Sequence, residues 1–224
     1  PMIYEFGGRR QLVIWSPKSI NGLNPETGAI YWAQPFLVRS ALTIPTPRKE
    51  GDLLFVTSFY NGPLMLTFQP GVPNPAVLWK GKSQSEQPNH TDGLHSIMPT
   101  PILKDGYIYG VCSYGELRCL KAETGERVWE SLAATGSHKK GEDRWKNAFL
   151  VPNSDRVFLF NEAGDLIIAR LTSKGYEEID RAHILEPTNG MPQRLVVWSH
   201  PAFANKCVVA RNDKEIISVS LAGE

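Results

Sequence analysis

The chain has 224 residues, 42% of them hydrophobic and 21% charged, which is the ordinary composition of a globular protein with a substantial core. Its formal net charge of +1 argues against a nucleic-acid-binding or membrane-surface protein, because such proteins carry strongly basic surfaces. No apolar run approaches the roughly 18 residues that a membrane-spanning helix needs. The length allows one all-β domain or two smaller domains.

Prolines at regular intervals divide the chain into similar segments. They are separated by about 50 residues, and a turn and an apolar strand follow each one. These prolines are Pro1, Pro47, Pro101, Pro152 and Pro201. A period of this length indicates a supersecondary unit that is copied along the chain.

Each segment begins with two short strands that are separated by turn-forming residues. In chain order, these strand pairs lie within 1–16, 47–58, 101–113, 152–162 and 201–212. A third strand follows each pair, within 19–24, 63–68, 116–121, 165–171 and 215–221. A fourth strand follows in all but the last segment, within 29–34, 76–81, 127–132 and 176–185. No stretch has helical periodicity of useful length.

Four antiparallel strands repeated at this interval predict the blades of a β-propeller. A single blade cannot bury both of its faces, so neighbouring blades must stack against each other. We predict an all-β chain in which 1–224 forms a single propeller domain or propeller fragment of about five blades. The expected blade boundaries are approximately 1–38, 39–88, 89–140, 141–190 and 191–224.

Two similar strings, GLNPETGAIYWAQ at 22–34 and CLKAETGERVWES at 119–131, place a tryptophan shortly after a Glu-Thr-Gly turn. Glycine supplies the positive φ that the turn needs, which predicts turns at Gly28 and Gly125. The tryptophan then lies on the outer strand, where its ring can dock against the neighbouring blade. In the fourth segment, Ile179 is expected to replace this tryptophan. The predicted docking residues are Trp32, Trp79 and Trp129.

This pattern resembles the tryptophan-docking motif of quinoprotein-type propellers. That family comprises the pyrroloquinoline-quinone (PQQ) dehydrogenases and their non-enzymatic PQQ-like repeat relatives. The match is good from Leu23 to Trp32 and from Leu120 to Trp129, and the insertion VPNPA after Gly71 distorts it. The chain from residue 147 onward is similar to the C-terminal half of PQQ-like repeat proteins of planctomycete-type bacteria. The resemblance implies a propeller that is exported to the periplasm or cell surface and has no settled activity.

The expected ring is open. The fifth segment ends after its third strand, and residue 1 already lies in the first strand of its own segment, so no spare strand is visible. Three arrangements remain: part of a larger propeller, a compact five-blade ring with an imperfect seam, or two copies that pair their open edges.

The third segment opens with candidate ligand-facing residues. His90, Asp92 and His95 lie within six positions, just before the innermost strand, and ligands of propellers normally sit near the inner strands and their loops. Together they could ligate a metal ion or position a substrate, although their spacing matches no established metal site. The alternative is a polar loop in which Asp92 and Gly93 form a turn and one histidine bonds to the backbone.

The fourth segment opens with an aromatic candidate. Trp145 and Asn147 are expected to alternate with Lys146 across the two faces of a strand. Trp145 at the mouth of the channel could stack on a flat ligand, and the alternative is that it fills the core or a junction between blades.

His200 opens the fifth segment, in the position that Thr46 and Thr100 hold in earlier segments. It is a candidate to contact a ligand, and the alternative is a bond from the strand end to the neighbouring blade. Arg211 and Asn212 end the next strand and are interpreted as turn residues.

The low and odd number of cysteines argues against a disulfide scaffold. With a turn at 114–115, Cys112 would lie opposite Leu117 and Cys119 opposite Gly110. A disulfide between them would therefore need another register.

Three functions from different classes fit these observations. The first is a non-catalytic binding or scaffold propeller that contacts a protein, a peptide or a glycan and for which no cofactor is predicted. The second is a PQQ-dependent dehydrogenase or a fragment of one, which would bind PQQ and calcium with Asp92 and Trp145 as stand-ins for the family's base and ring floor. This chain lacks the adjacent cysteines often found there. The third is a glycan-active hydrolase or lyase that uses His90, His95 or His200.

Overall fold

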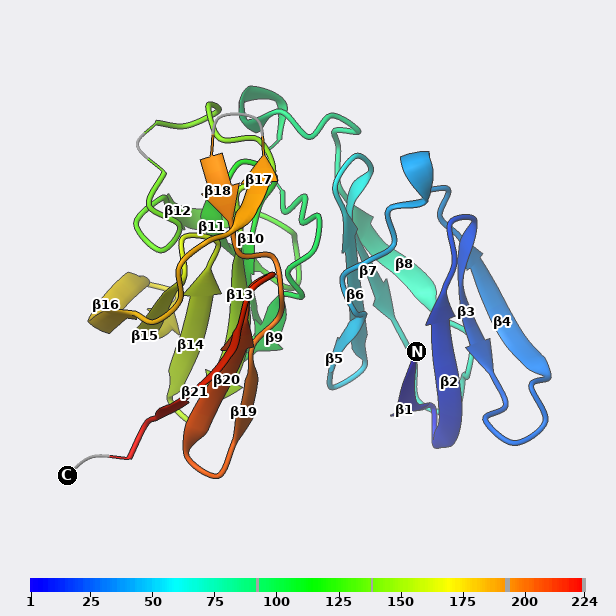
Figure 1. Ribbon diagram of the computed structural model, residues 1–224. Coiled ribbons are helices and arrows are strands. Elements are labelled where there is room, and N and C mark those ends of the chain that lie inside the picture. The colour runs from blue at the N-terminus through cyan, green and yellow to red at the C-terminus, as the bar shows by residue number, and fades with distance from the viewer. Residues whose placement is uncertain (92, 138, 192–193, 223–224) are drawn as a thin grey trace.

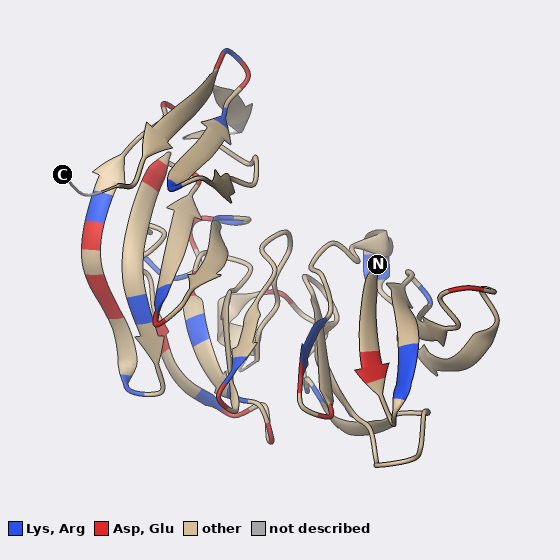
Figure 2. Ribbon diagram, turned by 90° about the horizontal axis from the view of Figure 1, so that it is seen from below, with Lys and Arg blue, Asp and Glu red and all other residues tan. Residues whose placement is uncertain are grey.

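The computed structural model describes residues 1–91, 93–137, 139–191 and 194–222. The described chain is almost entirely β-structure, with two short 3₁₀ turns, η1 (Arg39–Ala41) and η2 (Pro88–His90). The strands form antiparallel sheets that follow one another along the chain. Seen from two directions, the larger sheets fan out in an arc (Figures 1 and 2). The prediction of an all-β propeller built from four-stranded antiparallel blades is confirmed.

The first three blades have four strands each. Blade 1 contains β1 (Met2–Phe6), β2 (Arg9–Trp15), β3 (Ser19–Leu23) and β4 (Ile30–Pro35). Blade 2 contains β5 (Arg48–Glu50), β6 (Leu53–Ser58), β7 (Gly62–Thr67) and β8 (Ala76–Lys80). Blade 3 contains β9 (Ile102–Lys104), β10 (Tyr107–Val111), β11 (Leu117–Lys121) and β12 (Arg127–Ser131).

The last two blades are separated by a hairpin that the sequence did not predict. Blade 4 contains β13 (Ala148–Asn153), β14 (Arg156–Asn161), β15 (Asp165–Thr172) and β16 (Gly175–His183). The hairpin consists of β17 (Asn189–Met191) and β18 (Arg194–Val196). Blade 5 has three strands, β19 (Ala202–Ala204), β20 (Cys207–Arg211) and β21 (Ile216–Ser220).

Every four-stranded blade carries a β-bulge at the same place, between its third and fourth strands. The register shifts directly after Gly22, Met65, Cys119 and Ile168. The extra residues on the outer strands are Tyr31, Leu78, Val128 and Ile179. In blade 4, Asp180 therefore takes the place of the tryptophans, because it pairs with Ile168. Assigning Ile179 to that place was wrong by one position, since the bulged residue has no partner.

Each junction between neighbouring blades holds its own hydrophobic cluster. Because side chains alternate along a strand, adjacent residues of β6 serve opposite junctions. Leu54 and Val56 pack with blade 1, whereas Phe55 packs with blade 3. The same alternation separates Ile108 from Tyr109 in β10. The core is thus a series of layers between sheets.

Hydrogen bonds join the innermost strands of consecutive blades. Tyr4 Oη donates to the carbonyl of Pro47 at 2.8 Å, and Arg48 Nε donates to the carbonyl of Pro101 at 3.2 Å. Pro47 and Pro101 therefore provide acceptors at the inner edge of the arc, where a proline has no N–H to leave unpaired.

Two tryptophans of the outer strands reach the next blade. Trp79 Nε1 donates to the carbonyl of Ala122 at 2.7 Å, and Trp129 Nε1 donates to the carbonyl of Thr172 at 2.8 Å. The ring of Trp79 also lies against Gly125, where a Cβ would come within 2.9 Å of the indole. Since the φ of Gly125 is 72°, this position needs glycine both for its backbone and for space.

Trp32 makes its contact through a glutamine of its own blade. Its Nε1 donates to Gln11 Oε1, and Gln11 Nε2 donates to the carbonyl of Pro73 in blade 2 at 3.3 Å. Pro73 belongs to the insertion after Gly71, so Gln11 links the Trp32 indole to the connection between β7 and β8 of blade 2. This contact needs a glycine at position 22, because a Cβ there would overlap both the Trp32 indole and the Gln11 amide.

The β10–β11 hairpin differs by one residue from the register expected from the sequence. Cys119 pairs with Tyr109 rather than Gly110, and Leu117 pairs with Val111 rather than Cys112. One additional residue in the turn causes the shift. All the cysteines are free.

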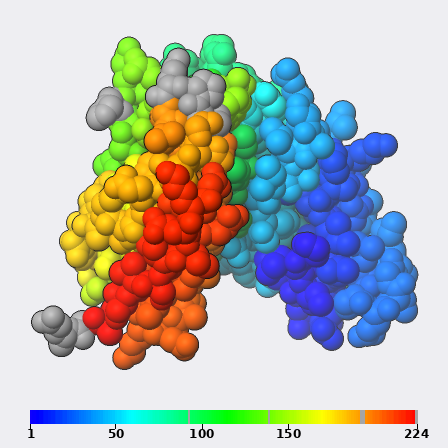
Figure 3. Space-filling view, in the orientation of Figure 1, coloured from blue at the N-terminus to red at the C-terminus, as the bar shows by residue number. Residues whose placement is uncertain are grey.

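The arc does not close. Within the described residues, no strand of blade 1 pairs with blade 5. A hollow separates these two blades in the space-filling view (Figure 3). On the inner side of the arc, Met2, Arg48, Ile102 and Pro152 from four successive blades line a cavity of about 300 Å³. An open arc of this kind is the arrangement expected of part of a larger propeller.

Candidate functional site

One side of the arc, at the top in Figure 1, collects the connections from each blade to the next. We call this side the loop face. Its connections are 36–47, 81–101, 132–147 and 184–201. Every candidate site residue from the sequence lies on one of these connections. Asp92, also a candidate, lies outside the described residues.

The two described histidines of the third segment have different surroundings. His95 is only 1% exposed, and its Nδ1 lies 3.0 Å from the carbonyl oxygen of Phe59 in blade 2. Its ring packs against Gly62, where a Cβ would lie 2.7 Å from Nε2. His90 is exposed at the end of η2. One imidazole is therefore packed inside the junction of blades 2 and 3, and the other lies at the surface.

Trp145 lies in a turn and Asn147 just before β13, and neither is on the strand that was expected, because β13 begins only at Ala148. Trp145 has a φ of 68°, which interrupts extended backbone, and its amide donates to the carbonyl of Ser113 at 2.9 Å. Asn147 is buried, and its Nδ2 donates to the carbonyl of Trp145 at 3.2 Å. Its Oδ1 has no hydrogen-bond partner among the described residues.

His200 is exposed at the start of blade 5. Its Nδ1 lies 2.7 Å from the carbonyl oxygen of Pro201, and its ring centre lies 4.9 Å from that of Phe149. At the equivalent position in earlier blades, Thr100 Oγ1 accepts a hydrogen bond of 3.0 Å from the Thr46 amide. This position thus links neighbouring blades where it is a threonine.

Arg144, which the sequence analysis did not single out, joins several blades at the loop face. Its Nη2 donates to Glu86 Oε1 at 3.0 Å and lies 3.4 Å from Tyr60 Oη. Its guanidinium carbon lies 4.9 Å from the centre of the Trp145 ring and 5.6 Å from that of Phe59. An arginine that is held by a carboxylate and by aromatic faces is well fixed in orientation.

Glu162 forms a second charged centre, in the turn after β14. Its buried carboxylate accepts hydrogen bonds from Arg194 Nε at 2.6 Å and from Trp198 Nε1 at 2.9 Å. Because both oxygens have a donor, the cost of burying this charge is offset. Arg194 Nη2 also donates to the carbonyl of Arg144 at 3.0 Å, so the two centres are connected.

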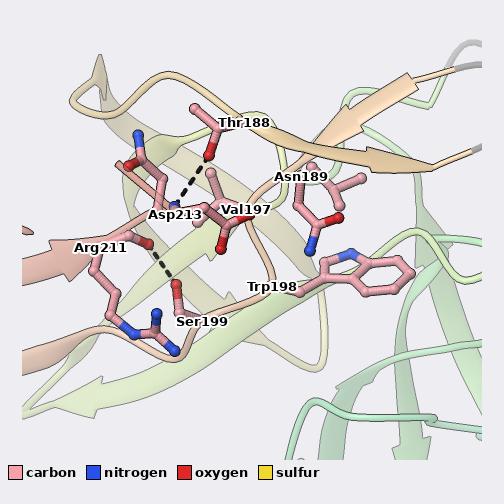
Figure 4. A pocket seen from close by; sticks show the side chains of 9 residues that line it. Thr188, Asn189, Val197, Trp198, Ser199, Arg211 and Asp213 are labelled. Carbon is pink, nitrogen blue, oxygen red and sulfur yellow. Dashed lines mark hydrogen bonds between the residues drawn. The ribbon is translucent and has the colours of Figure 1, made fainter. Parts of the chain in front are cut away.

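A pocket of about 140 Å³ opens beside Trp198, between the β17–β18 hairpin and blade 5 (Figure 4). Its walls are held by two bonds: the Asp213 amide donates to Thr188 Oγ1 at 3.1 Å, and Ser199 Oγ donates to the carbonyl of Arg211. Arg211 was interpreted from the sequence as a turn residue, and here it lines this pocket.

His183 ties the end of β16 to the connection that leads to the pocket. Its Nδ1 lies 3.1 Å from Asp165 Oδ1, and its Nε2 lies 3.0 Å from Glu186 Oε1. The hydrogen bond to Asp165 raises the pKa of His183 above its ordinary value. Burial raises the pKa of Asp165. The hydrogen bonds from Asn161, His183 and Arg181 together have a larger effect in the opposite direction, so the pKa of Asp165 lies below its usual value.

The junction between blades 2 and 3 is polar beneath the loop face. Arg118 is fully buried, and its Nη1 donates to the carbonyl of Gly93 at 2.6 Å and to Thr91 Oγ1 at 3.0 Å. Its Nε donates to Glu130 Oε2 at 3.2 Å. Its Nη2 has no hydrogen-bond partner among the described residues.

The described parts of the chain contain no group of three or more histidine, cysteine, aspartate and glutamate side chains placed to hold a metal ion. Nor do these parts of the chain contain a helix that is long and apolar enough to cross a membrane. The loop face instead presents arginines, aromatic rings and paired carboxylates that come from different blades.

The fold and this face define a β-propeller, and comparison with solved structures agrees. The chain is similar to BamB from Moraxella catarrhalis, with a TM-score of 0.63 and 14% identity, over 96% of this chain and 56% of BamB. It is also similar to the Cps50 (Swd1) β-propeller domain of Myceliophteria thermophila, with a TM-score of 0.55 and 12% identity, over 95% of this chain and 70% of that domain. At such identities the similarity shows the fold alone.

The chain spans little more than half the length of BamB. No protein-family model matches the sequence, and no curated protein is detectably similar to it. The resemblance to PQQ-like repeat proteins therefore stays a prediction, whereas the propeller fold is established.

Proposed function

We propose that the chain is a non-catalytic propeller module that binds a partner protein through its loop face. The observation that carries this proposal is the pair of connected centres around Arg144 and Glu162. They hold Tyr60, Trp145 and Trp198 in fixed positions on a surface contributed by several blades. Arginine, tyrosine and tryptophan on a rigid base are the residues that most often dominate the energy of protein interfaces.

Exposed apolar side chains lie on the same face. Leu195 on β18 is 57% exposed, and Leu37 and Ile44 on the connection from blade 1 to blade 2 are exposed as well. An apolar side chain beside arginines and aromatic rings suits the core of an interface. A peptide or a glycan would use the same surface, and we favour a protein because of these leucines.

The proposal places the protein in the periplasm or at the cell surface of a bacterium. The resemblance of its repeats to exported PQQ-like proteins supports this location. A second, weaker partner is another copy of the chain, paired through an open blade edge. Sedimentation over a range of concentrations would detect such pairing.

The two enzymatic alternatives find less support in the geometry. A quinone would need a free ring face beneath it, but the Arg144 guanidinium lies 4.9 Å from the centre of the Trp145 ring, and the turn gives Trp145 a positive φ. A side chain of the protein itself thus lies over one face of the Trp145 ring, and we propose no PQQ or calcium. A glycan-active site that includes His95 would need access to a buried ring.

A photo-crosslinking experiment tests the loop face. A photoreactive phenylalanine would replace Leu195 on the loop face and, as a matched control, Ile216 on β21, which is 70% exposed. We expect a discrete cross-linked product from position 195 in source-cell extract, and its loss when Tyr60→Ala is added. Equal products from both positions, or a product that survives Tyr60→Ala undiminished, would contradict the proposal.

A further inference from the structure

Two adjoining hollows form a groove on the outer side of the junction between blades 2 and 3. One has a volume of about 660 Å³ and is lined by Lys82, His90, Thr91, Arg127 and Lys140, among others. The other has a volume of about 330 Å³ and is lined by Pro63, Trp79, Lys80 and Gly125, among others. Because Lys82 and Arg127 line both hollows, we treat them as one surface, the flank groove.

Among the described residues, the wide end of the flank groove carries more positive than negative charge. Arg118, Arg127 and Lys140 all lie within 3.2 Å of the single carboxylate of Glu130. Lys82 adds another cation and makes no ion pair with a described residue, whereas Glu126, which lines the narrow hollow, is paired with Lys121 at 2.7 Å. A cleft lined by an excess of one charge attracts ligands of the opposite charge.

Arg118, buried behind the lining residue Thr91, adds to the positive potential in the groove. Its Nη1 donates to Thr91 Oγ1 at 3.0 Å, and Thr91 lines the groove. The guanidinium is fully buried, and its Nη2 has no partner among the described residues. A buried charge is screened less than an exposed one, so its effect reaches the groove more strongly.

The narrow end of the flank groove has a rigid apolar floor, formed by Trp79 and Pro63, between charged side chains. The indole of Trp79 is fixed by its bond of 2.7 Å to the Ala122 carbonyl and by its packing on Gly125. Pro63 lies beside it, and Gly81 carries no side chain there, since a Cβ would lie 2.7 Å from the Pro63 ring. An apolar floor that continues into a cluster of cations suits a ligand with both kinds of group.

We propose that the flank groove binds an acidic segment of a polypeptide. An apolar side chain of this segment packs against Trp79 and Pro63, and the carboxylates that follow it pair with Lys82, Arg127 and Lys140. A peptide fits better than an acidic glycan because only a peptide places an aliphatic side chain next to carboxylates. The wide end of the groove is lined by residues of two loop-face connections. The groove uses none of the residues of the Arg144 and Glu162 centres, so this inference does not rest on those centres.

Fluorescence anisotropy with a synthetic probe tests the inference. The probe is a fluorescein-labelled peptide in which one leucine precedes four glutamates. The double variant Lys82→Glu/Lys140→Glu should weaken binding by about ten-fold or more, because like charges then face the ligand. The matched control is Lys139→Glu, since Lys139 is 74% exposed next to Lys140, pairs with Glu142 and does not line the groove. This control should leave the affinity nearly unchanged.

Changes in the probe separate the two ends of the groove. Replacing the glutamates with glutamines should abolish binding, and replacing the leucine with serine should weaken it without abolishing it. The inference is wrong if the glutamine probe binds equally well, if the double variant binds like the unaltered chain, or if no binding occurs at millimolar concentration. It is also wrong if an oligogalacturonate binds more tightly than the peptide, because the occupant is then a glycan. Thermal unfolding of both variants checks that they are folded.

Discussion

Two glycines in equivalent turns have the same backbone conformation but different surroundings. The φ of Gly28 is 74° and that of Gly125 is 72°. Nothing lies within 4 Å of the place where a Cβ on Gly28 would be, whereas a Cβ on Gly125 would lie 2.9 Å from the Trp79 ring. The pair therefore separates the cost of a left-handed backbone from the cost of steric overlap with the tryptophan.

We predict that Gly28→Ala lowers the free energy of unfolding by about 1–2 kcal/mol, the cost of placing a Cβ in the left-handed region. Gly125→Ala should cost about 1–3 kcal/mol more, because the indole must move. Urea denaturation followed by tryptophan fluorescence measures both values. Equal losses in the two variants would show that Trp79 does not press on Gly125 in solution.

At the scale of elements, His183 connects the end of β16 to the chain that leads to blade 5. The pKa of His183 is raised in the folded protein, mainly by its bond to Asp165. The protonated form therefore favours folding. This stabilisation is complete below the unfolded pKa of about 6.5 and is lost as the pH rises through the higher folded value.

We predict that the melting temperature of the native chain falls between roughly pH 6 and pH 8 more steeply than that of His183→Gln. The effect should stay below about 1 kcal/mol, since the side chain is 46% exposed and the ion pairs are screened. Calorimetry at several pH values measures it. Parallel pH profiles for the two proteins would mean that His183 does not hold this connection.

The strands of this fold can be predicted from the sequence because each one alternates between two buried junctions and recurs with each proline-marked segment. The errors occur where the number of residues around a turn or bulge differs from the expected one. In blade 4 the ladder of β15 and β16 continues beyond the bulge to Thr172 and Gly175, and Asp180 rather than Ile179 pairs with Ile168. The longer turn before Leu117 shifted the partner of Cys119. A difference of one residue leaves little trace in composition or hydrophobic pattern, so the sequence does not reveal it.

The candidate site was harder to predict than the strands. Trp145 was expected on a strand, but its positive φ places it in a turn. Arg144 and Glu162 resemble solvated loop residues in the sequence, because charged residues in polar stretches usually face water. Only the folded arc brings Arg194 to both of them, to the carboxylate of Glu162 and to the carbonyl of Arg144.

At the scale of the whole molecule, the strand residues of each hydrophobic cluster come from two neighbouring blades. Phe68 illustrates this arrangement, because it stacks on Phe6 of blade 1 with ring centres 3.8 Å apart and belongs to the cluster between blades 1 and 2. Leu159 is fully buried in the cluster between blades 3 and 4. In such quasi-one-dimensional proteins, a defect at one junction is felt mainly by the units beside it.

We predict that Phe68→Ala, which should cost about 3–5 kcal/mol, speeds amide hydrogen exchange in blade 1 and leaves blades 4 and 5 nearly unchanged. Leu159→Ala should speed exchange in blades 3 and 4 instead. Hydrogen-exchange mass spectrometry distinguishes these outcomes. Uniform loss of protection from either variant would show that the arc unfolds as one cooperative unit.

The two-sided strands limit how such a chain can change its length over evolution. One codon inserted at the start of β6, before Leu54, would turn Leu54 and Val56 toward blade 3 and Phe55 toward blade 1, which would mismatch both layers at once. Duplication or loss of an entire blade leaves every remaining strand with its inward and outward sides unaltered. Genes for proteins of this architecture should therefore lengthen and shorten in steps of one blade.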